Sequence, residues 1–260
     1  MPAEISWIQL SAALVLVAVA IALSFWRGLG LERSIVWAAI RAAVQLVAVG
    51  VVLAWLLDPG RSLAWSWAWV AVMVVSAAVI VRSRANEIPG VLTMALAAFG
   101  AALVVALGVL FGLGIFELEP RTLIPMAGLT IGNAMTATVL VARRIYDGIR
   151  DQQGEVEARL ALGQAAPIAA RPYVRQALRT AMVPQIESTK AVGIVFLPGA
   201  MTGLILAGVD PLEAVKVQLA VMYLVLGAAA TTTTVVALGV RRRLFTRDHR
   251  LVPMPRPADR

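Results

Sequence analysis

Polar side chains inside apolar stretches are the residues of this chain whose types could do chemistry. Thr130, Asn133 and Thr136 follow one another at three-residue spacing in a glycine-containing apolar run. This spacing places them on a similar face of a helix, and polar groups inside a membrane are costly enough to suggest a function. The stripe predicts the lining of a translocation path. Interhelical hydrogen bonding explains the same residues, and both interpretations stay open.

Two features farther along the chain extend this candidate path. Glu187 and Lys190 lie three residues apart at the predicted cytoplasmic mouth of the sixth apolar run. They form either an intrahelical ion pair or an entrance that attracts cations. Pro198, followed at once by Gly199, predicts a kink or break, because proline removes a backbone donor. Broken helices often line a cavity.

A fixed metal site is not expected, so no metal ligand is assigned. His249 is the only histidine, and its place in a basic tail predicts a solvated side chain. Asp, Glu and His show no paired ligand spacing, and the chain has no cysteine, which excludes thiol and iron–sulfur chemistry. Four methionines could offer thioethers to a soft ion but more often fill gaps between helices, namely Met126, Met135, Met201 and Met222. Weak, transient binding of a metal substrate remains compatible with this pattern.

Motifs for catalysis are absent from the sequence. It contains no H-E-x-x-H, no G-x-S-x-G and no aspartyl pair within an apolar run, and one histidine leaves little acid–base chemistry. It also lacks the G-x-x-x-x-G-K-[ST] phosphate loop. The chain is therefore predicted not to be an enzyme and to hold no cofactor. If ATP drives it, ATP and Mg must be bound by a separate ATPase chain.

Composition identifies the elements that would position these residues. Of 260 residues, 60% are hydrophobic and 15% are charged, whereas soluble domains are about 45–50% apolar and about 25% charged. The sequence predicts an all-α polytopic membrane protein with one transmembrane domain over residues 1–260. The net charge of +8 is explained by membrane topology, so no nucleic-acid partner is expected.

About seven apolar runs are long enough to cross a bilayer, which takes about 20 residues. They lie near residues 5–26, 35–57, 64–81, 91–115, 122–142, 190–208 and 214–240. Arginines gather in alternate breaks and in the tail, 241–260, while the other breaks carry mainly carboxylates. Because basic residues accumulate in the cytoplasm, the N-terminus is predicted outside and the C-terminus inside. The residues after Arg250 are expected to be disordered.

The long polar segment 143–189 interrupts this pattern. We expect the fifth span to continue as a helix that ends near Gly163, then a turn over 164–167 and a second helix from about Pro172. Arg175 and Arg179 share one side of that second helix. The segment is either an amphipathic hairpin whose arginines meet anionic headgroups or a rigid element that docks on a soluble partner.

Two sets of residues carry a family resemblance. Glu157-Ala158 followed by Gly163 resembles the E-A-A-x-x-x-G coupling loop of ABC permeases, with Arg159 at the second alanine. Longer strings, LTIGNAMTATVL at 129–140, ALRTAMVPQIESTK onward at 177–222 and the RRRLFTRDHRL tail, look like the FetB-type family. Its members are bacterial iron-export ABC permeases, related to plant aluminium-tolerance half-transporters.

This resemblance implies a multi-pass permease subunit of the cell inner membrane that works as a homodimer with cytoplasmic ABC ATPase subunits. The residues expected to couple to the ATPase are Glu157, Ala158, Leu162, Gly163, Arg175 and Arg179. The implied process is export of iron; another metal or a nucleotide sugar remains open. The alternative is a secondary transporter driven by an ion gradient. It is disfavoured because no carboxylate is predicted deep within a span.

Overall fold

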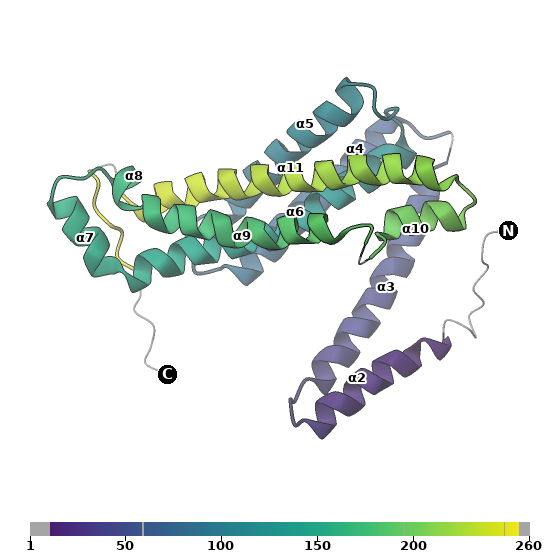
Figure 1. The fold of residues 1–260 in the computed structure, drawn as a ribbon, viewed down its shortest axis with the longest axis horizontal. Coiled ribbons are helices and arrows are strands. Elements are labelled where there is room, and N and C mark those ends of the chain that lie inside the picture. The colour runs from purple at the N-terminus through teal and green to yellow at the C-terminus, as the bar shows by residue number, and fades with distance from the viewer. Residues whose placement is uncertain (1–10, 59, 195, 247, 255–260) are drawn as a thin grey trace. The chain divides into compact units, whose positions relative to one another are not determined.

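The computed structural model describes residues 11–58, 60–194, 196–246 and 248–254, and within them the regular structure is helical (Figure 1). The chain divides into two compact units, residues 1–62 with 203–209 and residues 63–202 with 210–260. Five helices in the described part are long and apolar enough to cross a membrane. The predicted all-α, polytopic architecture is therefore confirmed.

The first unit contains two apolar helices, α2 (Leu14–Trp26) and α3 (Glu32–Leu56). The buried Ser24 hydroxyl fixes the turn between them: it donates to Glu32 Oε1 at 2.7 Å and accepts from the Leu31 N–H at 3.2 Å. The predicted span 35–57 corresponds to α3. The predicted span 5–26 is represented by α2, while its first residues lie outside the described part of the chain.

The second unit holds most of the buried core. Its helices are α4 (Leu63–Arg84), α5 (Val91–Gly112), α6 (Pro120–Asp151), α7 (Gln153–Ala161), α8 (Ala166–Ala169), α9 (Arg171–Ala191) and α11 (Pro211–Leu244). Helix α11 packs against α5 and α6, and α6 also contacts α4 and α9. Fully buried alanines such as Ala95, Ala127 and Ala229 lie in these helices, where small side chains allow close approach of backbones.

Helix α6 extends well beyond a single membrane crossing. Glu119 and Thr122 form a capping box at its start, and Pro120 occupies the first turn, where no N–H partner is needed. Its 32 residues correspond to about 48 Å at 1.5 Å per residue, against about 30 Å of hydrocarbon. The expected helical continuation of the fifth span into the polar segment is present, but it ends at Asp151 and not near Gly163, because the chain breaks at Gln152 and α7 follows as a separate helix.

The predicted sixth span, 190–208, is not one helix. Helix α9 ends at Ala191, Gly193 adopts a φ of +88°, and α10 (Gly199–Leu206) begins only after Pro198. The break anticipated at Pro198 and Gly199 is present. The residues before the break belong to α9 (Arg171–Ala191), which is the second helix predicted from about Pro172. Its buried alanines Ala177 and Ala181 pack as part of the core.

Two glycines of α11 offer a test of this packing. A Cβ added at Gly239 would lie 2.6 Å from Met94 Sδ and 2.8 Å from Met94 Cγ, whereas one added at Gly227 meets nothing within 4 Å. We expect Gly239→Ala to lower the free energy of unfolding by about 1–3 kcal/mol through overpacking. Gly227→Ala should leave it unchanged or raise it by up to about 1 kcal/mol, because alanine favours helix. Equal effects in denaturant titrations of detergent-solubilised protein would contradict the close α5–α11 contact.

Candidate functional site

A hollow of about 280 Å³ between α6 and α9 collects polar side chains within the apolar bundle. It is lined by Gly132, Asn133, Thr136, Ala137, Leu140, Ala181, Pro184 and Gln185. The Asn133 amide donates to the Leu129 carbonyl at 2.9 Å, and its own carbonyl oxygen has no partner among the described residues. The hollow therefore offers amide and hydroxyl oxygens that could hold a polar solute weakly.

Thr130 does not belong to this hollow, although the sequence placed it on the same stripe. Its side chain is completely buried, and its hydroxyl donates to the Met126 carbonyl at 2.7 Å. Three-residue steps rotate by about 300° in a helix of 3.6 residues per turn, so Thr130, Asn133 and Thr136 drift around the axis. Thr130 has turned into the core while the other two face the hollow.

Gln185 is a lining residue that the sequence analysis missed. It precedes Glu187 by two residues in a largely apolar stretch, so a polar amide between Pro184 and Ile186 was the available signal. The stretch was instead assigned to the segment before the sixth span. Only the pairing of α9 with α6 brings Gln185 opposite Asn133.

The register of these two helices sets the depth of the hollow. Tyr173 lies against Gly148, whereas Ala181 and Gln185 share the hollow with residues 132–140, so α9 runs antiparallel to α6. Asn133 precedes Arg144 by eleven residues, or about 16 Å along the helix. If the arginines at 143 and 144 mark the membrane boundary, the hollow lies near the middle of about 30 Å of hydrocarbon.

Glu187 and Lys190 lie beyond Gln185, near the C-terminal end of α9. Their Oε1 and Nζ atoms are 2.9 Å apart, and the side chains are 61% and 67% exposed. Because α9 already runs alongside α6 before residue 190, the pair lies near the level of Asn133 along α6; its position at the cytoplasmic mouth stays a prediction. Exposed charges at this depth require water or a polar surface beside them.

Pro198 and Gly199 mark the start of α10 and do not line the hollow of Asn133. Here the Thr202 hydroxyl donates to the Pro198 carbonyl at 3.1 Å, and the Met201 N–H donates to Gln218 Oε1 of α11 at 3.3 Å. Gln218 is only 4% exposed. This buried amide satisfies one of the unpaired N–H groups at a helix start and ties the broken segment to α11.

The polar segment forms the predicted helical hairpin. Helix α7 ends at Ala161, Gly163 adopts a φ of +84°, and α9 begins at Arg171. Leu162, beside that glycine, is 82% exposed, while Val156 within α7 is fully buried. Figure 1 shows α7 and α8 beyond the ends of α6, α9 and α11. The hairpin therefore presents an exposed tip on a packed base.

A hydrogen-bonded group joins α7 to α9. The Tyr173 hydroxyl donates to Glu155 Oε2 at 2.8 Å, and Arg159 donates to Glu155 Oε1 at 2.6 Å. These bonds, the tyrosine's first, lower the pKa of the Glu155 carboxyl. Burial, followed by the bond to Glu155, raises the pKa of Tyr173. The hairpin arms are thus fastened by a contact that depends on an ionised carboxylate.

The attachment of α7 should weaken in acid. A carboxyl group whose pKa is lower in the folded than in the unfolded protein stabilises the folded state at pH values above its unfolded pKa, near 4.5. This stabilisation is lost as the pH falls through the folded pKa. We expect amide hydrogen exchange in α7, after correction for the pH dependence of the intrinsic exchange rate, to accelerate below about pH 4.5. Tyr173→Phe should accelerate exchange at neutral pH and reduce this acid dependence. An unchanged acid response in Tyr173→Phe would contradict the assigned contact, and Gln176→Ala, an exposed α9 residue, serves as control.

The six residues expected to couple to an ATPase do not form one cluster. Glu157, Ala158, Leu162 and Gly163 lie at or beside the exposed tip, where Glu157 accepts from the Gln153 amide at 2.8 Å. Arg175 and Arg179 instead line a hollow of about 320 Å³ with Arg171 and Arg241, together with Pro167, Val174 and Leu178. No α7 residue lines that hollow.

The tail is ordered farther than predicted. Phe245 pairs with Leu251, the Val252 N–H donates to the Leu244 carbonyl at 2.9 Å, and Met254 is buried. The apolar side chains at 251, 252 and 254 pack back because a tight turn reverses the chain after α11. The rest of the expected disordered tail, 255–260, lies outside the described residues.

His249 in that turn is exposed, and its Nδ1 accepts the Ala166 N–H at 3.4 Å. It therefore contacts the start of α8. Within the described residues no group of three His, Cys, Asp or Glu side chains could hold a metal ion.

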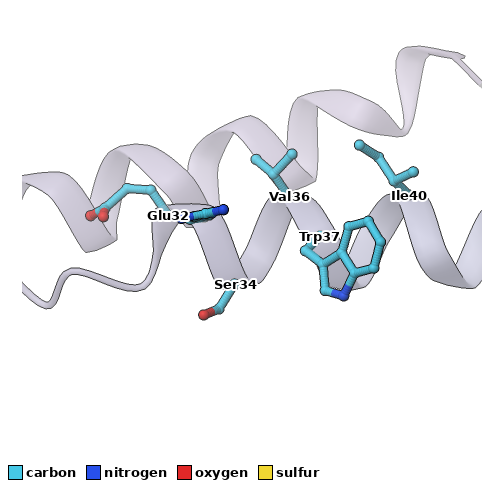
Figure 2. Close-up of a pocket in the computed structure, with 6 residues that line it drawn as sticks. Glu32, Ser34, Val36, Trp37 and Ile40 are labelled. Carbon is cyan, nitrogen blue, oxygen red and sulfur yellow. The ribbon is translucent and has the colours of Figure 1, made fainter.

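Another hollow, of about 660 Å³, lies along the start of α3 and offers no comparable site. It is lined by Glu32, Arg33, Ser34, Val36, Trp37 and Ile40, all from that single helix (Figure 2). The Glu32 carboxylate already accepts from Ser24. Without a second wall the side chains cannot converge on a ligand.

Comparison with known proteins identifies the family. The family described as "Uncharacterised protein family (UPF0014)" matches residues 7–245. The chain belongs to the UPF0014 family. The rice "UPF0014 membrane protein STAR2" is 38% identical over 222 residues, covering 85% of this chain and 78% of the relative. Arabidopsis thaliana "Protein ALUMINUM SENSITIVE 3" is 34% identical over 241 residues, 93% of this chain and 88% of the relative.

A bacterial UPF0014 relative has a name that states a transport activity. The "Probable iron export permease protein FetB" of Escherichia coli K12 is 35% identical over 148 residues, which is 57% of each chain. The resemblance to FetB-type permeases and the plant aluminium-related proteins is therefore confirmed, and this UPF0014 protein is a membrane protein of a permease family. No solved structure matches the chain.

Proposed function

We propose that this UPF0014 chain is the permease subunit of an ATP-driven ABC exporter for a metal ion, iron in the first place. The observation that carries the proposal is the exposed tip at Leu162 and Gly163, held on a base continuous with the helices that line the polar hollow. A separate ATPase, carrying ATP and Mg, would dock on this tip. The iron assignment draws on the bacterial relative's name.

The proposed coupling runs through two contacts. Ile149 of α6 and Val156 of α7 are both fully buried in the core, and Tyr173 of α9 bonds Glu155 of α7. A push on the tip would therefore reach α6 and α9 together. Because these helices form the walls of the hollow at Asn133 and Gln185, their relative movement would open it alternately to either side, which requires two discrete packed states.

The proposed path uses the unpaired polar face of α6 and α9. Asn133, Thr136, Gln185 and the exposed Glu187–Lys190 pair lie at similar depths, and a second copy facing them would enclose a hydrated route. Amide, hydroxyl and carboxylate oxygens bind hard cations, and so few of them would bind weakly enough to release the ion. In this arrangement the hairpin and C-terminus are cytoplasmic, and the membrane is the cell inner membrane.

The alternative is a secondary transporter driven by an ion gradient. The position of Glu187 near the level of Asn133 is the observation that favours it. An intramembrane carboxylate is what a proton relay needs. Glu187 is, however, paired with Lys190 at 2.9 Å, and no carboxylate lines the hollow at Asn133 that could pass a proton onward. The pair fits an ATP-driven route better.

Co-purification with a separately expressed ATPase tests the proposal. Glu157→Ala and Gly163→Pro should each weaken association and ATPase stimulation at least fivefold, because proline cannot adopt a positive φ and interface energy concentrates in few residues. Glu117→Ala and Gly114→Pro, from the α5–α6 connection, are the matched controls. Glu117 is exposed, like Glu157. Gly114, like Gly163, has a positive φ, and its N–H donates to the carbonyl three residues earlier.

Association that survives both tip variants would refute the coupling assignment. Vesicle flux that follows an imposed proton gradient without ATP would establish the alternative. Assays with iron, other divalent metals and nucleotide sugars would identify the substrate.

A further inference from the structure

Four arginines converge on one hollow at the junction of α8, α9 and α11. Arg171, Arg175 and Arg179 stand at four-residue spacing along α9, which places them in one stripe. Arg241 of α11 joins them, and Pro167, Val174 and Leu178 provide apolar lining. The hollow measures about 320 Å³. The proposed coupling tip contributes nothing to it.

These arginines have no counter-charge within the described chain. No carboxylate lines the hollow, and none of the four side chains forms an ion pair or hydrogen bond with a described residue. Arg143 and Arg159, by contrast, are paired, with Glu87 at 3.2 Å and with Glu155 at 2.6 Å. Four like charges held together without a partner repel one another, so an anion in the hollow would be strongly stabilised.

The hollow also lies where a membrane surface is expected. In α11, no charged residue occurs between Lys216 and Arg241, a distance of about 37 Å along the helix, which exceeds the hydrocarbon thickness of about 30 Å. Arg241 therefore stands at the boundary. Across from it, α9 continues from Arg179 into the bundle toward Gln185. An occupant would have water on one side and hydrocarbon on the other.

We propose that this hollow binds the phosphodiester headgroup of an anionic phospholipid. Guanidinium groups bind phosphate through two parallel hydrogen bonds, and basic pockets between membrane helices suit lipid headgroups. The apolar side chains of Val174 and Leu178 would contact the glycerol and upper acyl chain. An acidic protein surface would use the arginines but not this apolar lining at the boundary. A bound lipid links α9 to α11, which flank α6 together.

Nanodiscs containing the full-length protein test the proposal. Retention of phosphatidylglycerol over phosphatidylcholine is measured by native mass spectrometry after release from the nanodisc. Arg175→Gln and Arg241→Gln should each reduce this preference roughly fivefold, and the double variant roughly 25-fold. Arg175→Lys keeps the charge but loses the paired hydrogen bonds, and it should retain an intermediate preference. Arg242→Gln is the control, because Arg242 is exposed on the same helix but does not line the hollow.

Three outcomes would overturn the proposal. The first is equal lipid preference in Arg242→Gln and the two hollow variants, with circular dichroism showing all of them folded. The second is that the protein in phosphatidylcholine alone binds inorganic phosphate as well as it binds phosphatidylglycerol, and that the hollow variants weaken this phosphate binding. The site would then bind a free anion. The third is unchanged lipid preference with weakened ATPase binding, which would assign the arginines to a protein partner. The lipid measurement uses no ATPase, so it stands or fails independently of the exporter assignment.

Discussion

Replacing Glu187 by glutamine is expected to lower metal flux at least tenfold without loss of folding or ATPase association. The carboxylate lies beyond Gln185 near the C-terminal end of α9 and is 61% exposed in the protomer. In the proposed path it supplies the negative charge that offsets the loss of a cation's hydration shell, which is costly inside a membrane. Glutamine keeps the shape and hydrogen bonding but removes that charge.

Flux in vesicles containing the permease and its ATPase measures this effect. Glu213→Gln is a closely matched control: Glu213 pairs with Lys216 at the same i,i+3 spacing, at 2.6 Å, and is also 61% exposed. Glu213 lies in the first turn of α11, away from the hollow. Equal flux in the two variants would reduce Glu187 to a surface ion pair.

Asn133→Ala, which removes an amide from the hollow between α6 and α9, should lower flux several-fold.

Truncating Ile149 to alanine is expected to cost about 2–5 kcal/mol of unfolding free energy, the range for buried isoleucine. Ile149 is fully buried in the part of α6 beyond Arg144, where it shares the core with Val156. The cavity would loosen the base of the hairpin and uncouple its tip from α6. Denaturant titration and limited proteolysis within α7 measure the two consequences.

Leu162→Ala is the counterpart that separates stability from docking. Leu162 is 82% exposed at the tip, so its truncation should change the unfolding free energy by no more than about 0.5 kcal/mol. It should nevertheless weaken ATPase association, because exposed leucine is expected to contact the partner. If Leu162→Ala binds the ATPase normally, the tip is not the docking surface. If Ile149→Ala unfolds like wild type, the hairpin is not anchored through this residue.

Residue chemistry along the chain was sufficient to predict the five long apolar helices and the hairpin. Apolar runs of membrane length must form helices, since the bilayer leaves no other partner for the backbone. Gly163 and Pro172 marked the turn, because glycine adopts a positive φ and proline fits a first helical turn. The strings at 129–140 and 177–222 were specific enough to indicate the family that the UPF0014 match confirmed.

The positions of Glu187, Gln185 and Thr130 were decided by helix pairing. Apolar content placed the sixth span at 190–208, yet the helix predicted from about Pro172 packs its alanines in the core despite nearby charges and ends at Ala191. Antiparallel pairing with α6 then carries Glu187 to the depth of Asn133. Thr130 left the predicted stripe because helical rotation turns it into the core.

The sequence by itself thus determined that this is a polytopic helical protein with a polar hairpin and no phosphate loop of its own, because those properties depend on local composition and spacing. Only the tertiary structure decided which polar residues share the hollow between α6 and α9. It also decided which arginines of α9 lie together with Arg241 of α11. The physical reason is that depth and convergence depend on the register and rotation of one helix against another. That register is set by the packing of small side chains contributed by distant segments.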